Sequence, residues 1–281
     1  MMRGLRQVAV AVRSPEGEIV LHKEVLTPWR KRHPILALPL IRGSVTLVES
    51  MAIGFRMLNV SANIATGEKP EKGESWFAIA IGLLLFVLLF KVLPATAFKF
   101  LQPFVPNILF LNAIEGGIRM SIFLLYLGGI SLLPDVRRLF EYHGAEHQVI
   151  HCYESGKELT PENAKAFPSA HPRCGTSFLL VTLVLSILIF ALLGSTPTIL
   201  DRVVRQLLLL PVVAGFSYEL IRLAGKGGRE KNLIGRIALF LTIPGIWLQG
   251  LTTRKAQDDQ LEVAIASLHG ALEDPADLIV P

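Results

Sequence analysis

The chain has 281 residues, of which 51% are apolar and 18% are charged, and its formal net charge at pH 7 is +5. The mean hydropathy of +0.49 is above that of ordinary soluble domains, so several continuous apolar segments are expected. This composition excludes a disordered chain and argues against an ordinary soluble enzyme. With only two cysteines, a small disulfide scaffold is excluded as well.

The first part of the chain, residues 1–33, is predicted to form a cytoplasmic β-hairpin. Residues 7–12 alternate as a strand requires, with the valines on one face. The turn sequence Ser14–Gly17 follows, and residues 19–21 belong to a second alternating run. Two short strands joined by a tight turn are therefore expected.

Residues 34–75 are predicted to contain an amphipathic helix and a loop. Arg42, Glu49 and Arg56 are spaced seven residues apart, which places them on one helical face. Such a helix could re-enter the membrane, lie in its interface or pack against polar partners. The last two arrangements are favoured, because three charges on one face are costly in hydrocarbon.

Four segments are long and apolar enough to cross the hydrocarbon core of a membrane, which takes about 20 residues. They are residues 76–98, 108–133, 175–193 and 203–223. Together they predict an all-α polytopic membrane protein with about four transmembrane helices, in a first pair within 76–133 and a second pair within 175–223.

Charged residues decide between four and five spans. Clusters of Lys and Arg precede the first pair and follow the second, and the positive-inside rule places both clusters in the cytoplasm. A fifth apolar segment, 232–251, is interrupted by Arg236 and Pro244. It is predicted to be an interfacial helix, because a fifth span would export the C-terminal tail. Both termini are then cytoplasmic.

The remaining part of the chain, 224–281, is predicted to comprise a basic loop, this interfacial helix and an acidic amphipathic tail. Apolar residues of the tail follow helical spacing: Leu261, Ala264, Ile265, Leu268 and Leu272. Asp258 and Asp259 precede them as a candidate N-cap. The tail is therefore expected to be a helix with one apolar face.

Two opposite-charge pairs lie inside the predicted spans, Glu115 with Arg119 and Glu219 with Arg222. Ionisable groups within a membrane are either functional or paired for packing. The packing interpretation is favoured here, and transport of an ion or small molecule through these helices is the weaker alternative.

The segment 134–174 contains the residues most typical of chemistry. It holds four of the seven histidines and both cysteines. Pro134 and Asp135 favour a helix start, and helical character continues to about Cys152. On that helix His143 and His147 are one turn apart, which is how a helix presents two nitrogen ligands to one metal ion.

The pentapeptide from His143 to His147 also fits the H-x-x-E-H pattern of zinc hydrolases, with Glu146 as the general base. Further ligands are predicted from His171 and Cys174. His151, Cys152 and Arg173 are alternative ligands or supporting residues. The metal is predicted to be zinc, with another divalent ion as the alternative.

Three interpretations of this cluster stay open. A closed set of four ligands would be structural, whereas three ligands with an open position would be catalytic. The histidines could also form a solvated polar helix face without a metal. Spacing alone does not choose among them.

The motifs HGAEHQVIHCYE and HPRCGTSFLL and the tail LTTRKAQDDQLEVAIASL resemble the YqhQ-like family of bacterial inner-membrane proteins. That family is a domain of unknown function described as a candidate metal-dependent enzyme. The resemblance covers almost the whole chain. It implies roles for the His, Glu, Cys and Arg residues named above in 143–174, and for Arg42-Gly43 and Thr252-Thr253-Arg254.

The leading hypothesis is an integral inner-membrane, zinc-dependent enzyme of hydrolase type, with its site at the cytoplasmic membrane face. Membrane lipids and a membrane-protein partner or substrate are expected to contact it. Nucleic acid is not, because the basic clusters flank membrane spans. The alternative is a non-enzymatic scaffold or accessory subunit with a structural zinc site.

Overall fold

A computed structural model describes residues 1–4, 6–31, 33–67, 72–172, 174–194, 196–230 and 233–272. The strands are β1 (Met2–Arg3), β2 (Gln7–Arg13) and β3 (Ile19–Val25). The longer helices are α1 (Ile41–Thr66), α2 (Lys72–Val87), α3 (Leu93–Leu101), α4 (Ile108–Ile130), α5 (Pro134–Glu154), α7 (Gly175–Ala191), α8 (Ile199–Glu230), α9 (Leu233–Thr252) and α10 (Asp258–Ala271). Short turns complete the elements: η1 (Trp29–Lys31), η2 (Pro34–Ala37), the π-helical turn η3 (Leu88–Val92) and α6 (Pro161–Lys165).

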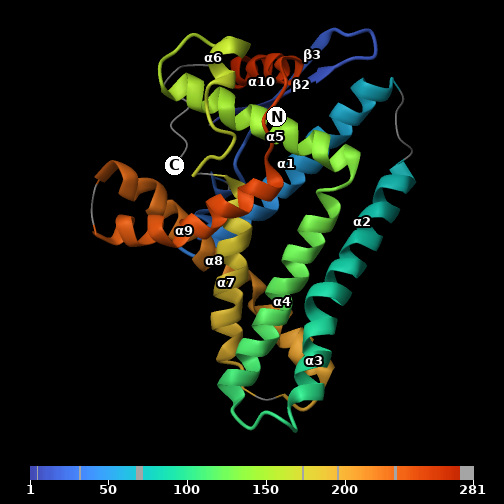
Figure 1. Ribbon diagram of the computed structural model, residues 1–281, viewed down its shortest axis with the longest axis vertical. Helices are drawn as coiled ribbons and strands as arrows, with labels where there is room; N and C mark the ends of the chain where they lie inside the picture. The colour runs from blue at the N-terminus through green and yellow to red at the C-terminus, as the bar shows by residue number, and fades with distance from the viewer. Residues whose placement is uncertain are drawn as a thin grey trace.

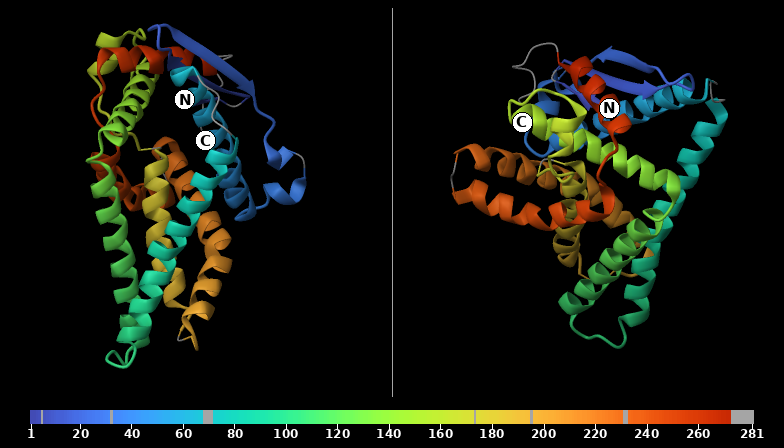
Figure 2. Two further views of the ribbon diagram at one scale, coloured as in Figure 1. Left: turned by 90° about the vertical axis from the view of Figure 1, so that its right-hand side faces the viewer. Right: turned by 45° about the horizontal axis from the view of Figure 1, so that its top comes forward.

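The molecule has two parts. A layer contains the sheet, α1, α5, α6 and α10, and a bundle of α2, α3, α4, α7 and the first half of α8 extends away from it (Figures 1 and 2). The second half of α8 and α9 form a helical hairpin beside the junction of the two parts (Figure 1). The chain between α5 and α7 returns from the layer to the bundle, so the centre described below lies at this junction.

The predicted hairpin is confirmed, and β1 adds a third strand. The order is β1-β2-β3 with antiparallel pairing, and the register places Val10 opposite His22. The central strand β2 is buried on both faces. Val8, Val10 and Val12 pack against α1, whereas Ala9 faces α10, where the small side chain lets the helix approach. The sheet therefore joins α1 and α10 in one layer.

Helix α1 carries the predicted charge stripe, and every charge of the stripe is paired. The pairs are Arg42–Glu219 (2.6 Å), Arg3–Glu49 (3.0 Å) and Arg56–Glu24 (2.5 Å). Glycines bring α1 close to α8, since a Cβ on Gly43 would lie 2.7 Å from Cβ of Tyr218. The stripe is thus explained by packing against polar partners.

The prediction of four spans is supported in part. In the described residues, two helical segments are long and apolar enough to cross a membrane, Ile79–Leu101 and Ile108–Ile130. Helix α7 is apolar but has only 17 residues, fewer than the roughly 20 that a span needs. Helix α8 carries charged residues along its length, including Arg205 within the predicted span.

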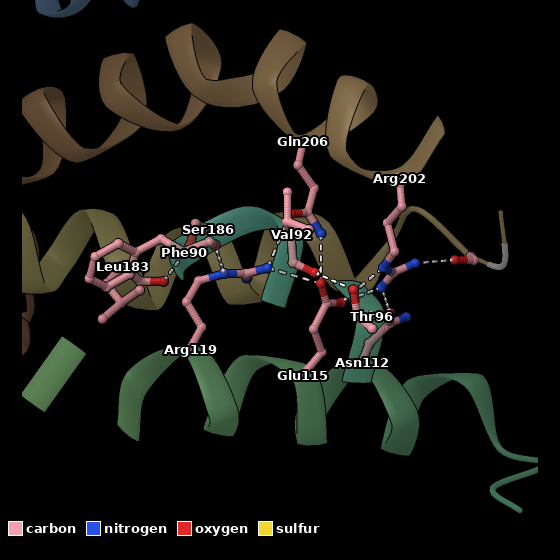
Figure 3. A network of polar contacts seen from close by, with 11 residues as sticks. Phe90, Val92, Thr96, Asn112, Glu115, Arg119, Leu183, Ser186, Arg202 and Gln206 are labelled. Carbon is pink, nitrogen blue, oxygen red and sulfur yellow. Dashed lines mark hydrogen bonds and ion pairs between the residues drawn. The ribbon is translucent and has the colours of Figure 1, made fainter. Parts of the chain in front are cut away.

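A buried polar network joins α4 to α8 (Figure 3). The Glu115 carboxylate accepts hydrogen bonds from Arg119 (3.0 Å), Gln206 (2.8 Å) and Arg202 (3.0 Å). Both members of the predicted Glu115–Arg119 pair are almost fully buried, at 2% and 3% exposed. Because Arg202 comes from α8, the network fixes the two helices against each other.

The π-helical turn η3 supplies one further acceptor to this network. Pro94 at the start of α3 has no N–H, so it cannot donate to the carbonyl of Phe90 four residues earlier. That carbonyl instead accepts from Nε of Arg119 at 3.2 Å. The proline therefore frees a backbone group that the neighbouring helix uses.

The predicted tail helix is confirmed as α10. Leu261, Ala264 and Leu268 are buried against β2 and α5. The predicted N-cap is wrong by one residue: Gln257 is the cap, and its N–H donates to Oε1 of Gln260 at 3.0 Å. The acids Asp258 and Asp259 occupy the first turn instead, where their negative charges interact favourably with the positive end of the helix dipole. Residues 273–281 of the predicted tail lie outside the described residues.

Candidate metal centre

Helix α5 places three histidines on one face, and the returning segment adds a fourth. His143 and His147 lie one turn apart, with ring centroids separated by 4.5 Å. The ring of His171 lies 5.7 Å from that of His147 and 4.6 Å from that of His151. The four imidazoles therefore form a continuous row along α5.

His143, His147 and Cys174 form one group. Their donor atoms all lie within 4.8 Å of one another, and Sγ of Cys174 is 3.2 Å from Nε2 of His143. Cys174 is also the N-cap of α7, where its sulfur accepts from the N–H of Thr176 at 3.5 Å. Two imidazole nitrogens and a thiolate are ligands that zinc prefers.

Backbone carbonyls orient both imidazoles of this group. Nδ1 of His143 contacts the carbonyl of Thr252 at 2.9 Å, and Nδ1 of His147 contacts that of Ser169 at 2.6 Å. A carbonyl oxygen only accepts, so both Nδ1 atoms carry the proton when the rings are neutral. The Nε2 lone pairs are then available for a metal, as is usual where an outer hydrogen bond fixes a metal-ligating histidine.

The electrostatics of the group favour a thiolate. Burial raises the pKa of the Cys174 thiol, but hydrogen bonds from His143 and His147, together with their charges, outweigh it and lower the pKa to about 5. For His143, burial lowers the pKa of the imidazole, but the hydrogen bond to Cys174 and its charge raise the pKa overall. A thiolate at neutral pH is the form that binds metal ions.

Segments remote in sequence hold the centre in shape. A Cβ on Gly144 would lie 1.7 Å from the carbonyl oxygen of Arg254, so only glycine allows this close approach. The N–H of Arg254 donates to the carbonyl of Phe140 at 3.0 Å. Because Arg254 follows Thr252 by two residues, this contact also positions the carbonyl that orients His143. These contacts give a physical reason for the role that the family resemblance implies for Thr252–Arg254.

Gln249 of α9 is a site residue that sequence reasoning missed. Its side-chain oxygen accepts from the N–H of His171 at 2.8 Å, and its amide donates to the carbonyl of His171 at 2.9 Å. The available signal is a glutamine in the largely apolar stretch 232–251, because an amide that becomes buried needs hydrogen-bond partners.

His171 belongs to a second group, with His151 and Glu154. The donor atoms of these three residues also lie within 4.8 Å of one another, and Nε2 of His171 is 3.6 Å from Oε2 of Glu154. The structure thus brings three of the four predicted ligands together and places the fourth in an adjacent set.

The other predicted residues take different places. Glu146 is next to the first group, and its Oε1 contacts the amino group of Met1 at 2.5 Å. Cys152 is fully buried in the hydrophobic core with Val149, and burial raises the pKa of its thiol. Arg173 lies outside the described residues.

A cavity of about 250 Å³ faces both groups. Its lining includes His143, His147 and Cys174 of the first group, Glu154 and His171 of the second, and Glu146. An adjoining groove of about 670 Å³ runs between β2, α1 and α5 and shares His143 and Glu146 with the cavity. The donor groups are thus accessible to a small molecule.

These features define a largely helical protein with a histidine and cysteine centre where two structural parts meet. Residues 38–274 match the family described as "Protein of unknown function (DUF1385)". The chain is 32% identical to "Uncharacterized protein YqhQ" of Bacillus subtilis (strain 168), over 97% of this chain and 89% of the relative. No solved structure matches the chain at a significant level. The chain belongs to the DUF1385 family, as the sequence resemblance to YqhQ-like proteins predicted.

Proposed function

We propose that this protein is an integral inner-membrane metal protein whose centre, held by His143, His147 and Cys174, is that of a zinc-dependent hydrolase. The observation that carries the proposal is the orientation of the two imidazoles. Each ring donates a hydrogen bond from Nδ1 to a backbone carbonyl, which leaves its Nε2 available to bind a metal ion together with the Cys174 thiolate. A polar surface helix has no need of this arrangement.

A membrane location is supported by the surface of the bundle. Large apolar side chains are exposed along the two candidate spans, including Leu83, Leu84, Leu125 and Phe110. A soluble protein rarely exposes so much contiguous apolar surface. We propose that α7 and α8 are embedded beside these spans, with the basic clusters and the centre on the cytoplasmic side. Lipids would then cover the bundle.

An enzymatic role is supported by the open side of the first group. Three protein ligands would leave a position free, as in catalytic zinc sites, and all three residues line the cavity of about 250 Å³. A bound divalent ion would supply Lewis-acid chemistry there. Glu146 lines the same cavity and would accept a proton at its carboxylate during hydrolysis. At this depth the substrate would be a lipid or a membrane protein.

The decisive experiment compares two variants with the wild type. Metal content is measured on detergent-purified protein, and function by complementation of a strain that lacks the gene. His143→Ala/His147→Ala should lose the metal and the function. Glu146→Gln should keep the metal and lose the function, whereas the exposed control Glu162→Gln should keep both. Wild-type protein that holds no metal when kept away from chelators would end the proposal.

A scaffold with structural zinc is the second candidate, and one observation favours it. Cys174 both caps α7 and contacts α5, so a metal there would tie the bundle to the layer. In that case Glu146→Gln would complement fully, and Cys174→Ala would unfold the junction and release bound membrane-protein partners.

A further inference from the structure

We infer that the protein holds a second divalent ion, ligated by His151, Glu154 and His171, on the same cavity as the first. The inference rests on the proposed function, because the first ion is part of it. It would make the centre a two-ion site rather than a single zinc site.

The geometry of the second group is that of a ligand set. Three donors from two separate segments converge within 4.8 Å. An ion pair would explain why His171 and Glu154 lie together, since Nε2 of His171 is 3.6 Å from Oε2 of Glu154. It does not explain why His151 presents a third donor atom at the same place, with its ring 4.6 Å from that of His171.

The ring of His151 is oriented by a backbone carbonyl, as the rings of the first group are, and the backbone of His171 is fixed by a side chain. Nε2 of His151 donates to the carbonyl of Ala170 at 3.0 Å, which leaves the Nδ1 lone pair for a metal. The backbone of His171 is held on both sides by Gln249. A packing role for His171 would not need its N–H and its carbonyl to be fixed by the same side chain.

The chemistry of the two groups differs. The first contains a buried thiolate, which selects softer ions such as Zn²⁺. The second offers two imidazoles and the carboxylate of Glu154, whose side chain is 40% exposed. Such a nitrogen and oxygen set accepts Zn²⁺, Mn²⁺, Fe²⁺ or Co²⁺ and exchanges them more readily. We therefore expect the second ion to bind more weakly than the first.

The two groups share one cavity. Glu154 and His171 line it together with His143, His147 and Cys174. Two ions that face one cavity can polarise opposite sides of the same substrate group, as in two-metal hydrolases. The rings of His147 and His171, 5.7 Å apart, mark where the two sites meet.

Cobalt distinguishes the two sites, because only a thiolate ligand gives a sulfur-to-cobalt charge-transfer band. Full-length protein in detergent is stripped with a chelator and titrated with Co²⁺, and the bound metal is measured by mass spectrometry. We expect about two equivalents in the wild type, of which only one produces the band. Cys174→Ser should lose the band and still bind the other equivalent.

Glu154→Gln and His151→Ala should each lose one equivalent and keep the band. The matched controls are Glu162→Gln and His269→Ala, whose exposed side chains lie outside both groups, and both should bind as the wild type does. Circular dichroism confirms that each variant is folded. Glu154→Gln is informative even if His151→Ala unfolds, because its side chain is partly exposed and nearly isosteric.

The outcomes separate this inference from the proposed function. One equivalent with the band intact in the wild type would overturn the second site and leave the first in place. Two equivalents in Glu154→Gln and His151→Ala would overturn the ligand assignment. Absence of the band would overturn the first site and, with it, the proposed function.

Discussion

At the scale of the residue, the centre depends on backbone groups as much as on its ligands. The carbonyls of Thr252 and Ser169 fix which nitrogen of each imidazole is free. Neither carbonyl can be removed by changing a side chain, but the segments that carry them can be displaced. Gly144 is the residue through which the Thr252–Arg254 segment reaches α5.

Gly144→Ala should therefore disrupt the centre without touching a ligand. Its Cβ would lie 1.7 Å from a backbone oxygen, and overpacking of this kind costs about 3 kcal/mol. Gly250→Ala is the control, because apart from its chain neighbours and its own helix backbone no atom lies within 4 Å of the Cβ it would add on α9, and alanine favours a helix. Thermal unfolding and metal content are measured for both. Equal stability of the two variants would contradict the packing seen here.

The Cys174 thiol should titrate at low pH in metal-free protein. Its pKa is lowered from 9.0 to about 5, so the thiolate should persist at neutral pH and disappear as the pH falls through about 5. The measurement is the ultraviolet absorbance of the thiolate in chelator-stripped protein. His147→Ala should move the midpoint upward, because one of the groups that lower the pKa is removed. The pKa of Cys152 is raised, so its ionisation falls in a separate, alkaline range.

Sequence predicted the local part of this centre and missed the part that depends on tertiary structure. That His143 and His147 lie on the same face of a helix follows from helical periodicity alone. The choice between His171 and Cys174 as third ligand depends on how residues 155–174 return to α5, which no spacing rule describes. Gln249 lies 78 positions from His171, and its role follows from the docking of α9.

At the scale of the element, buried charge rather than apolar surface fixes how α4 and α8 meet. Arg119 and Arg202 approach one carboxylate, that of Glu115, and Arg202 also donates to Asn112 at 2.5 Å (Figure 3). Sequence identified the Glu115–Arg119 pair because its partners are one helical turn apart. Arg202 was not included, because its partner is on another helix.

Glu115→Gln should destabilise the bundle strongly. It leaves the buried guanidinium groups of Arg119 and Arg202 without their counter-charge, and breaking a buried pair in this way costs about 3–5 kcal/mol. Glu262→Gln is the control, because that carboxylate is 52% exposed and pairs with Arg13 at the surface, where a salt bridge contributes about 0–1 kcal/mol. The free energy of unfolding of both variants is measured in detergent by titration with a denaturing surfactant. A small effect of Glu115→Gln would mean that water reaches the network.

At the scale of the whole molecule, the centre lies where the layer and the bundle join. His143, His147 and His151 belong to α5 of the layer, and Cys174 is the N-cap of α7 of the bundle (Figure 1). If the bundle is embedded in lipid, as we propose, the centre lies at the membrane surface. Burial between neighbouring helices also explains why the composition predicted more spans than the helix lengths support. Helix α7 is uniformly apolar partly because its neighbours cover it, as the burial of Leu180, Val181 and Phe190 shows.

This arrangement predicts that the same substitution, at two equally exposed positions, will have different effects in the bundle and in the layer. Leu125 of α4 is 76% exposed and Val25 of β3 is 73% exposed. An aspartate at the centre of a lipid-facing helix opposes insertion by about 3 kcal/mol, whereas an aspartate at the edge of the layer faces water. Leu125→Asp should therefore lower the fraction that resists alkaline carbonate extraction from membranes, and Val25→Asp should not. Equal extraction of the two variants would show that α4 is not embedded in lipid.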